Sequence, residues 1–381
     1  MFMNKILTVE KMIFGGYGLA RTDTGVIFVE DALPGETVEY SVNSNVQGVP
    51  LATPLKYIEK SDKRRLPICK YYNECGGCNW LHIDPLYQAD IKRDVFLDCL
   101  SRIGKIKKLP DITTINSPDV NYRIRAQFKT DGCGVYGFFK KKTNDVVRIN
   151  ECPLLDNKCN NILQRIQGRT FNVSKAGLKV IAGISNVASD PVLPDLTFAA
   201  TELMVGGNTF SVKGDSFFQS NRFITERMGL WAKPFVGGDY CVDLYGGTGF
   251  FSIMLADVFR KITLIESVGS QVDMARKNFE RNGCYHCQAV CSDSEKMRQF
   301  IKQKIACLVV DPPRPGLTKE VRQSIQSIKP HQILYISCNP STQARDVASF
   351  INNGYTITNA VIFDCYPNTS HIETGILLSI D

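Results

Sequence analysis

The chain has 381 residues, of which 44% are hydrophobic and 22% charged, and its formal net charge is +7. These values exclude a wholly disordered chain, allow two or three domains, and permit a polyanionic partner without requiring one. No run approaches the ~18–20 apolar residues of a membrane helix, and the first residues do not resemble a signal peptide, so we expect a cytoplasmic protein with no membrane partner.

The first part of the chain, residues 6–58, consists of short apolar runs separated by glycine and proline. This pattern predicts a small β-barrel, which we place in a first domain of residues 1–58. Residues 56–70 follow with six basic and two acidic side chains. They predict a solvated linker that is able to contact phosphates.

The next segment, residues 59–212, is predicted to be a central domain of short strands with a helix near residues 155–167. The apolar spacing over residues 86–103 predicts another helix, which can pack on the domain that follows. Residues 213–381 then alternate between strand and helix patterns, which indicates a doubly wound, mostly parallel sheet. The expected strands are 240–245, 261–266, 286–291, 307–310, 332–336, 355–363 and 373–380. The last two are too close together for a connecting helix and should form an antiparallel hairpin.

A glycine-rich turn follows the first of these strands, at residues 246–249. The dinucleotide fingerprint is incomplete, because its third glycine position holds Ser252. Asp243, just before the turn, is unfavourable for a pyrophosphate but suits a ligand that carries an ammonium and a sulfonium. Glu266 ends the next strand, where a carboxylate can accept both ribose hydroxyls. Together these features favour S-adenosylmethionine over NAD, while a glycine turn without a ligand stays as the alternative.

Two polar motifs follow the fourth and fifth strands, at residues 311–316 and 337–340. The carboxyl ends of parallel strands form the ligand site of such sheets, so Cys338 is a candidate nucleophile. In a methyltransferase, a thiolate that adds to C6 of uracil makes C5 nucleophilic enough to take a methyl group. A base must then remove the C5 proton, and the segment before the last strand offers Glu373 and His371.

The fourteen cysteines include three close together, with a fourth, followed by proline, far downstream. This set is Cys69, Cys75, Cys78 and Cys152. Four thiolates suit zinc or an iron–sulfur cluster, and the three-plus-one spacing favours the cluster. Cys159 is a less favoured fourth ligand because no proline follows it. Cys284, Cys287 and Cys291 are too spread along a strand for one tetrahedral metal and are expected to be core or surface thiols.

With these motifs in place, the chain resembles the S-adenosylmethionine-dependent RNA uridine-5-methyltransferases that carry an N-terminal TRAM domain and a [4Fe-4S] cluster. The resemblance covers essentially the whole chain. It rests on residues 14–20 with 32–36, 216–221, 311–314, 337–340 and 367–373. It implies a class I methyltransferase sheet with a terminal antiparallel hairpin, preceded by a TRAM (OB-like) barrel and a central iron–sulfur β domain.

The resemblance also implies roles for individual residues. Cys338 would be the nucleophile and Glu373 the base. The cofactor site would be lined by Gln219, Tyr245, Glu266, Asp293 and Asp311. The cluster ligands would be Cys69, Cys75, Cys78 and Cys152.

The implied reaction is methyl transfer from S-adenosylmethionine to C5 of one uridine in 23S ribosomal RNA. The same chemistry on transfer RNA is the first alternative, and a non-catalytic iron–sulfur RNA-binding protein is an alternative from another class. The barrel and the basic segments disfavour a small-molecule methyltransferase. We expect a monomer that holds a structured RNA through its phosphates and takes the target base out of its stack.

Overall fold

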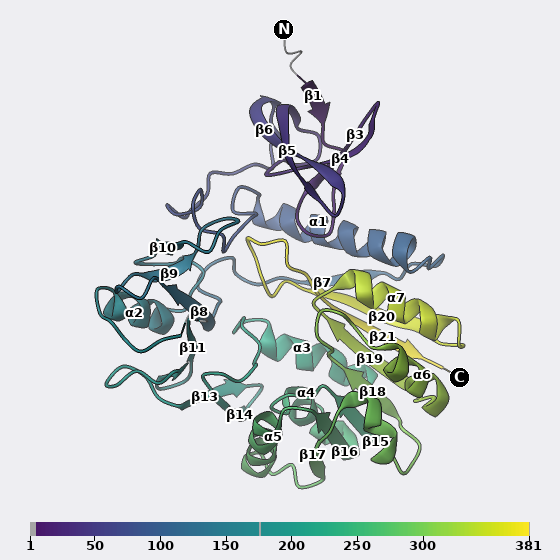
Figure 1. The fold of residues 1–381 in the computed structure, drawn as a ribbon. Helices are drawn as coiled ribbons and strands as arrows, with labels where there is room; N and C mark the ends of the chain where they lie inside the picture. The colour runs from purple at the N-terminus through teal and green to yellow at the C-terminus, as the bar shows by residue number, and fades with distance from the viewer. Residues whose placement is uncertain (1–4, 175–176, 381) are drawn as a thin grey trace.

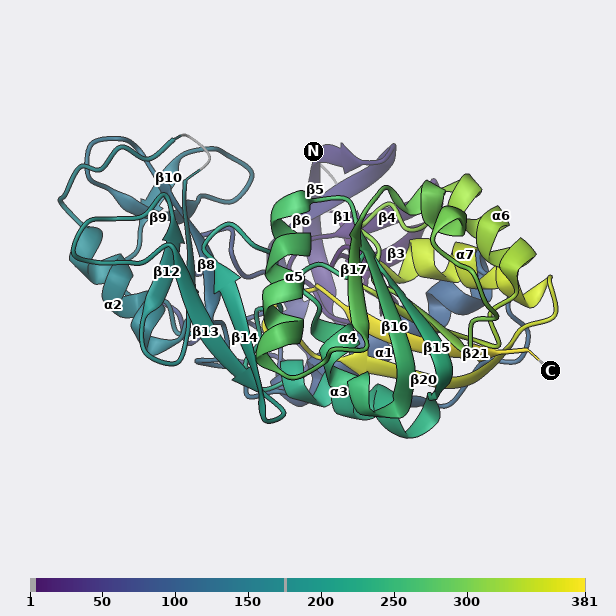
Figure 2. The same cartoon turned by 90° about the horizontal axis from the view of Figure 1, so that it is seen from below.

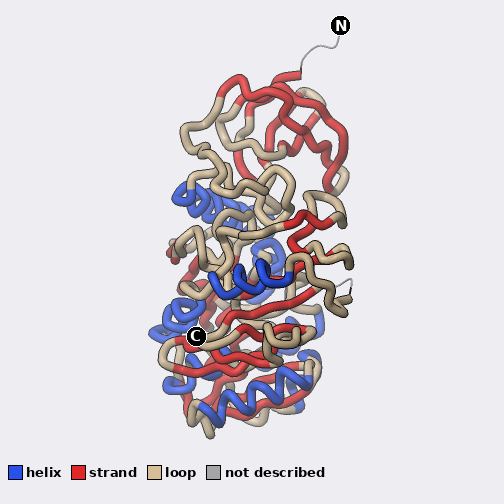
Figure 3. The backbone as a smooth tube through the Cα atoms, turned by 90° about the vertical axis from the view of Figure 1, so that its left-hand side faces the viewer, coloured by secondary structure: helices blue, strands red, loops and turns tan. Residues whose placement is uncertain are grey.

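The computed structural model describes residues 5–174 and 177–380. A strand-rich N-terminal region lies at one end of the molecule, and a layered assembly of helices and strands lies at the other (Figures 1 and 3). Within the described residues, no helix combines the length and apolar character that crossing a bilayer requires.

The N-terminal region is a six-stranded sheet in the order β1-β5-β6-β4-β3-β2. Its strands are β1 (Lys5–Thr8), β2 (Lys11–Met12), β3 (Gly18–Thr22), β4 (Gly25–Val29), β5 (Thr37–Val46) and β6 (Val49–Glu59). Small and β-branched side chains, among them Val29, Val38 and Ala52, form its own hydrophobic core. The β-rich character that the glycine and proline spacing predicts is therefore confirmed.

The middle of the chain forms a five-stranded sheet in the order β10-β9-β8-β11-β12, followed by a two-stranded hairpin. The elements are β8 (Arg125–Thr130), β9 (Tyr136–Phe139), β10 (Val146–Arg148), α2 (Asn157–Ile166), β11 (Leu178–Ala182), β12 (Val187–Asp190), β13 (Ala200–Val205) and β14 (Asn208–Lys213). Helix α2 begins where the Asp156 carboxylate accepts a hydrogen bond from the Lys158 amide at 2.8 Å. Leu163 and Ile166 of this helix are buried in the same core as Phe128 of β8.

The C-terminal sheet has eight strands in the order β17-β16-β15-β18-β19-β21-β20-β7. They are β7 (Ile112–Ile115), β15 (Gly238–Leu244), β16 (Phe259–Glu266), β17 (Cys287–Cys291), β18 (Cys307–Val310), β19 (Gln332–Ser337), β20 (Thr356–Phe363) and β21 (Glu373–Ser379). Each predicted strand is present within two residues of its expected ends. The predicted antiparallel hairpin is confirmed, because β21 pairs antiparallel with both β19 and β20.

Strand β7 was missed by the sequence analysis. It lies in the segment that we assign to the central domain, yet it pairs in parallel with β20 and forms the edge of the C-terminal sheet. A run of only four residues gives no periodic signal that connects it to strands so far downstream.

Helices cover both faces of this sheet (Figure 2). They are α1 (Pro85–Asp98), α3 (Thr225–Ala232), α4 (Phe250–Met254), α5 (Gly269–Arg281), α6 (Lys319–Ile328) and α7 (Pro340–Ile351). Side chains of α1, α6 and α7 share one core with Val242 and Leu244 of β15. Side chains of α3, α4 and α5 share another core with Cys241 of the same strand. Successive side chains of β15 therefore point alternately into the two helical layers on opposite faces of the sheet.

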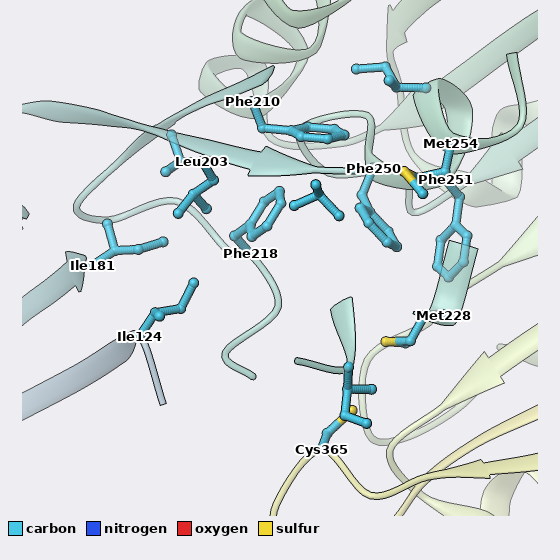
Figure 4. Close-up of a cluster of buried hydrophobic side chains, with 14 of the residues drawn as sticks. Ile124, Ile181, Leu203, Phe210, Phe218, Met228, Phe250, Phe251, Met254 and Cys365 are labelled. Atoms are coloured by element: carbon cyan, nitrogen blue, oxygen red, sulfur yellow. The ribbon is translucent and has the colours of Figure 1, made fainter. Parts of the chain in front are cut away.

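The second of these cores also extends beyond the sheet into the middle region, as Figure 4 shows. Its labelled members are Ile124, Ile181, Leu203, Phe210, Phe218, Met228, Phe250, Phe251, Met254 and Cys365. The rings of Phe210, Phe218 and Phe250 pack against one another, with ring centroids 5.4 to 6.0 Å apart. The middle region and the C-terminal sheet are thus joined by continuous apolar packing.

Helix α1 is distant in sequence from the C-terminal sheet but packs against it. A pair of substitutions in α1 tests this packing. Phe96 is fully buried against the sheet, whereas Leu86 of the same helix is 74% exposed. Phe96→Ala should lower the free energy of unfolding by about 3–5 kcal/mol because it opens a cavity. Leu86→Ala should change it by less than about 0.5 kcal/mol. Urea unfolding measures both, and equal effects would contradict the packing of α1.

Candidate active site

The glycine turn after β15 has a backbone that few residues can adopt. Tyr245 has a φ of +64° and Gly249 a φ of +91° just before α4 begins. At Gly246, a Cβ atom would lie 2.4 Å from the Leu264 side chain, so only glycine fits between the strands. Asp243 Oδ2 accepts hydrogen bonds from Ser252 N at 3.0 Å and Ser252 Oγ at 2.6 Å. This carboxylate therefore fixes the first turn of α4.

Glu266 stands at the end of β16, beside the glycine turn. Its Oε2 accepts a hydrogen bond from Gly247 N at 3.2 Å, and its Oε1 accepts one from Val268 N at 2.9 Å. Tyr245, Glu266 and Asp293 line a single cavity of about 100 Å³ with neighbouring serines and Glu295. The structure thus brings three of the five predicted cofactor residues together at the carboxyl edge of the sheet.

The other two predicted cofactor residues lie elsewhere around the turn. Gln219 is 6% exposed and follows Phe218, which packs on Phe250 at the start of α4. Asp311 follows β18, and its charge acts on both Cys338 and Glu373. Neither residue lines the cavity of Glu266. Asp311 therefore belongs with the thiol, and the contact of Gln219 with a methyl donor stays a prediction.

Cys338 and Glu373 meet because their strands are neighbours. Ser337, the last residue of β19, pairs with Thr374 at the start of β21. The thiol is half-buried and the carboxyl is 4% exposed. Burial and the nearby carboxylates of Glu373 and Asp311 raise the pKa of Cys338 to about 11, and Arg314 opposes this shift. The charge of Glu373 therefore acts on the thiol of Cys338.

The carboxyl groups of the site also have raised pKa values. Burial raises the pKa of Asp311 to about 7, helped by Asp243. Burial and Asp311 raise the pKa of Glu373 well above its usual range, while Arg314 opposes the shift. A carboxyl group with a raised pKa is a stronger base once it is ionised, which suits proton abstraction from carbon. Arg314 is the cation that faces the thiol and the carboxyl together, a role that its place in the sequence motif did not reveal.

His371, the competing candidate for the base, is arranged differently. Burial and the positive charges of Arg314, Lys92 and Arg123 lower its pKa to about 4. Its ring packs on Tyr366 at 5.7 Å, and the side chain lines a cavity that also contains the four predicted ligand cysteines. Glu373 is favoured over His371 because its strand pairs with the strand that precedes Cys338 and its charge raises the pKa of that thiol.

The cysteine cavity has a volume of about 320 Å³ and is lined by Cys69, Cys75, Cys78 and Cys152, among others. Cys159 is not among its lining residues and is fully buried in the core. Among the described side chains, no group of three or more His, Cys, Asp or Glu residues is arranged to hold a single metal ion. Four thiols around one cavity fit a group that is larger than one ion, as an iron–sulfur cluster is.

Comparisons with known proteins complete this picture. The model of the family described as tRNA (Uracil-5-)-methyltransferase matches residues 183–380. The chain belongs to this family. An uncharacterized RNA methyltransferase of Aquifex aeolicus is 32% identical, with 98% of each chain covered. A 23S rRNA (uracil(1939)-C(5))-methyltransferase RlmD of Marinomonas sp. is 30% identical, over 97% of this chain and 93% of the relative.

A solved structure shares the fold of the whole chain. It is the tRNA (uracil-54, C5)-methyltransferase of Pyrococcus abyssi in complex with S-adenosyl-L-homocysteine. The TM-score is 0.76 at 23% identity, and 98% of this chain and 100% of that chain are covered. As a family member, this chain is an RNA (uracil-5-)-methyltransferase that uses S-adenosylmethionine.

The charges around Cys338 predict how its reactivity changes on substitution. Because Arg314 lowers the pKa of this thiol, Arg314→Ala should slow its alkylation at pH 8. Because Asp311 raises the pKa, Asp311→Asn should speed it, in each case by about two- to tenfold. With a pKa of about 11, the wild-type rate should rise about tenfold per pH unit from pH 7 to pH 10.

Mass spectrometry of the Cys338 peptide after brief iodoacetamide treatment measures this rate. The exposed Cys133 provides an internal control in the same samples, because it belongs to a distant loop of the middle region. Equal rates in both variants, or the reverse order, would show that these charges do not control the thiol.

Proposed function

We propose that this methyltransferase transfers a methyl group to C5 of a uridine in 23S ribosomal RNA through a covalent adduct on Cys338. The observation that carries the mechanism is the pairing of β19 with β21, which sets Cys338 beside Glu373. The 30% identity to a 23S ribosomal RNA enzyme over nearly the full length of both chains supports the ribosomal target. A transfer RNA uridine is the second candidate, because the matching family model carries that description.

The reaction follows from the side chains at the strand ends. The Cys338 thiolate adds to C6, and the electron pair of the C5–C6 double bond moves to make C5 an enolate carbon. C5 takes the methyl group from the sulfonium of S-adenosylmethionine, leaving S-adenosylhomocysteine. Glu373 then accepts the C5 proton, the C5–C6 double bond re-forms, and the S–C6 bond breaks to release the thiolate.

The cofactor site of this proposal consists of Gln219, Tyr245, Glu266, Asp293 and Asp311. Glu266 would accept hydrogen bonds from the ribose hydroxyls. Its position at the end of β16, next to the glycine turn, suits this role. Asp311 would link this site to Cys338, since the charge of Asp243 acts on Asp311 and the charge of Asp311 acts on the thiol. The methyl donor and the target base would therefore meet at the carboxyl ends of β15, β18 and β19.

The remainder of the chain would bind RNA and a cluster. The proposal divides the chain into three domains. Residues 1–58 form a TRAM-like RNA-binding barrel, residues 59–212 form a central domain with the iron–sulfur site, and residues 213–381 form the methyltransferase domain. Cys69, Cys75, Cys78 and Cys152 would hold a [4Fe-4S] cluster, since all four line one cavity. When bound, the cluster would supply a covalent cross-link between two distant stretches of chain. Asn160 already bonds the backbone of Cys152 on both sides, at 2.9 and 3.0 Å.

The order of the chemistry predicts what Glu373→Gln does. The amide retains the size of the side chain but cannot accept the C5 proton, so methyl transfer should proceed and release should stall. With uridine RNA and labelled S-adenosylmethionine, the label should migrate with the protein on a denaturing gel. Cys338→Ala should give no adduct. If Glu373→Gln releases 5-methyluridine at a near-normal rate while His371→Ala stalls, His371 is the base.

The cluster predicts the metal content of the purified protein. Anaerobic preparations should be brown and contain about four irons per chain. Cys75→Ser should lose the colour and most of the iron, whereas Cys291→Ser, at an exposed cysteine outside the cavity, should retain both. Elemental analysis and the visible absorption spectrum measure this. Zinc without iron in the wild-type protein would refute the cluster.

A further inference from the structure

The loop of residues 364–372 connects β20 to β21 and delivers Glu373 to the active site. It contains no helix or strand, yet most of its residues are buried. Its start is held by the fully buried Lys92 of α1, whose Nζ donates to Asp364 Oδ1 at 2.6 Å and to Tyr366 O at 3.1 Å. The position of Glu373 is therefore set by contacts from outside its own sheet.

The middle of the loop is fixed at Asn368, which has a φ of +68°. Its amide N–H donates to Gln88 Oε1 at 2.7 Å, and its Nδ2 donates to Asp119 O at 2.7 Å. Its carbonyl accepts a hydrogen bond from Trp80 N at 3.1 Å. Three separate segments of the chain thus hold one residue of the loop.

The last anchor before Glu373 comes from the cysteine segment. Asn79, directly after Cys78, accepts a hydrogen bond from Ser370 N and donates one to Ser370 Oγ, both at 2.9 Å. Gly16 of the N-terminal sheet region packs on this pair, since a Cβ there would lie 2.6 Å from Asn79 Nδ2 and from Ser370 Cβ. The three regions of the molecule therefore meet three residues before the base.

We propose that Asn79 is a positioning residue that fixes the loop so that the Glu373 carboxylate faces C5 of the methylated uridine. The proposal rests on the function proposed above, in which Glu373 accepts the C5 proton. Cys338 directly follows β19 and lies outside this loop, so we expect thiolate addition and methyl transfer not to depend on Asn79. Proton removal does depend on it, because a displacement of about 1 Å in a reacting group costs up to about a hundredfold in rate.

The test separates release from methyl transfer. Asn79→Ala removes both bonds to Ser370, so the methylated protein–RNA adduct should be released at least about tenfold more slowly than in the wild type. The amount of label transferred in the first turnover should stay near the wild-type level. Asn79→Asp should restore release, because its carboxylate accepts hydrogen bonds from both Ser370 N–H and Ser370 O–H.

Asn282→Ala is the matched control, since Asn282 makes an equivalent pair of bonds to the Thr209 backbone, both at 2.9 Å, far from the loop. It should lower thermal stability without increasing the adduct. If Asn79→Ala does not fold, Ser370→Ala replaces it and should slow release to a smaller extent. Normal release in both loop variants, or an equal loss of transfer and release, would overturn the proposal. Absence of adduct in Glu373→Gln would instead refute the proposed function.

Discussion

The active site depends on the direction of one strand. Every strand of the C-terminal sheet runs the same way except β21, which enters between β19 and β20 in the opposite direction. Parallel strands present only their carboxyl ends at the ligand edge, so a residue that begins a strand would ordinarily lie at the opposite edge. The reversal of β21 places Glu373 at the same edge as Cys338. The proposed base and the proposed nucleophile are thereby set opposite each other, one at the start of β21 and the other directly after β19.

This arrangement has an electrostatic cost that the protein offsets with one cation. A thiol and two carboxyl groups lie close together: Asp311 and Glu373 raise the pKa of Cys338, and Asp311 also raises the pKa of Glu373. Only some of these groups can be ionised at the same time, since like charges in a poorly solvated site disfavour each other. Arg314 lowers the pKa of both Cys338 and Glu373, so it makes the charged forms of both more accessible. The proposed reaction needs the thiolate first and the carboxylate afterwards.

The alternating pattern of the C-terminal half was enough to predict its strands, their hairpin and the edge where Cys338 lies. Local signals sufficed there, because each strand is bounded by turns and each motif follows a strand end. The position of Asp311 beside the thiol, outside the cavity of Glu266, required the three-dimensional register. So did the bonds of Asn79 and Lys92 to the loop before Glu373, which join residues nearly 300 positions apart. A lone asparagine after a cysteine carries no pattern that predicts such a partner.

The positions of strand β7 and helix α1 in the chain affect how the protein folds during synthesis. Both precede the middle region in the chain but complete the sheet that the last strands build. During synthesis, they leave the ribosome long before β20 exists, and the apolar face of α1 must wait for its partner. A fragment that begins after the middle region would lack both elements. It would present the unpaired edge of β20 and a bare hydrophobic face to solvent, which favours association with other chains over folding.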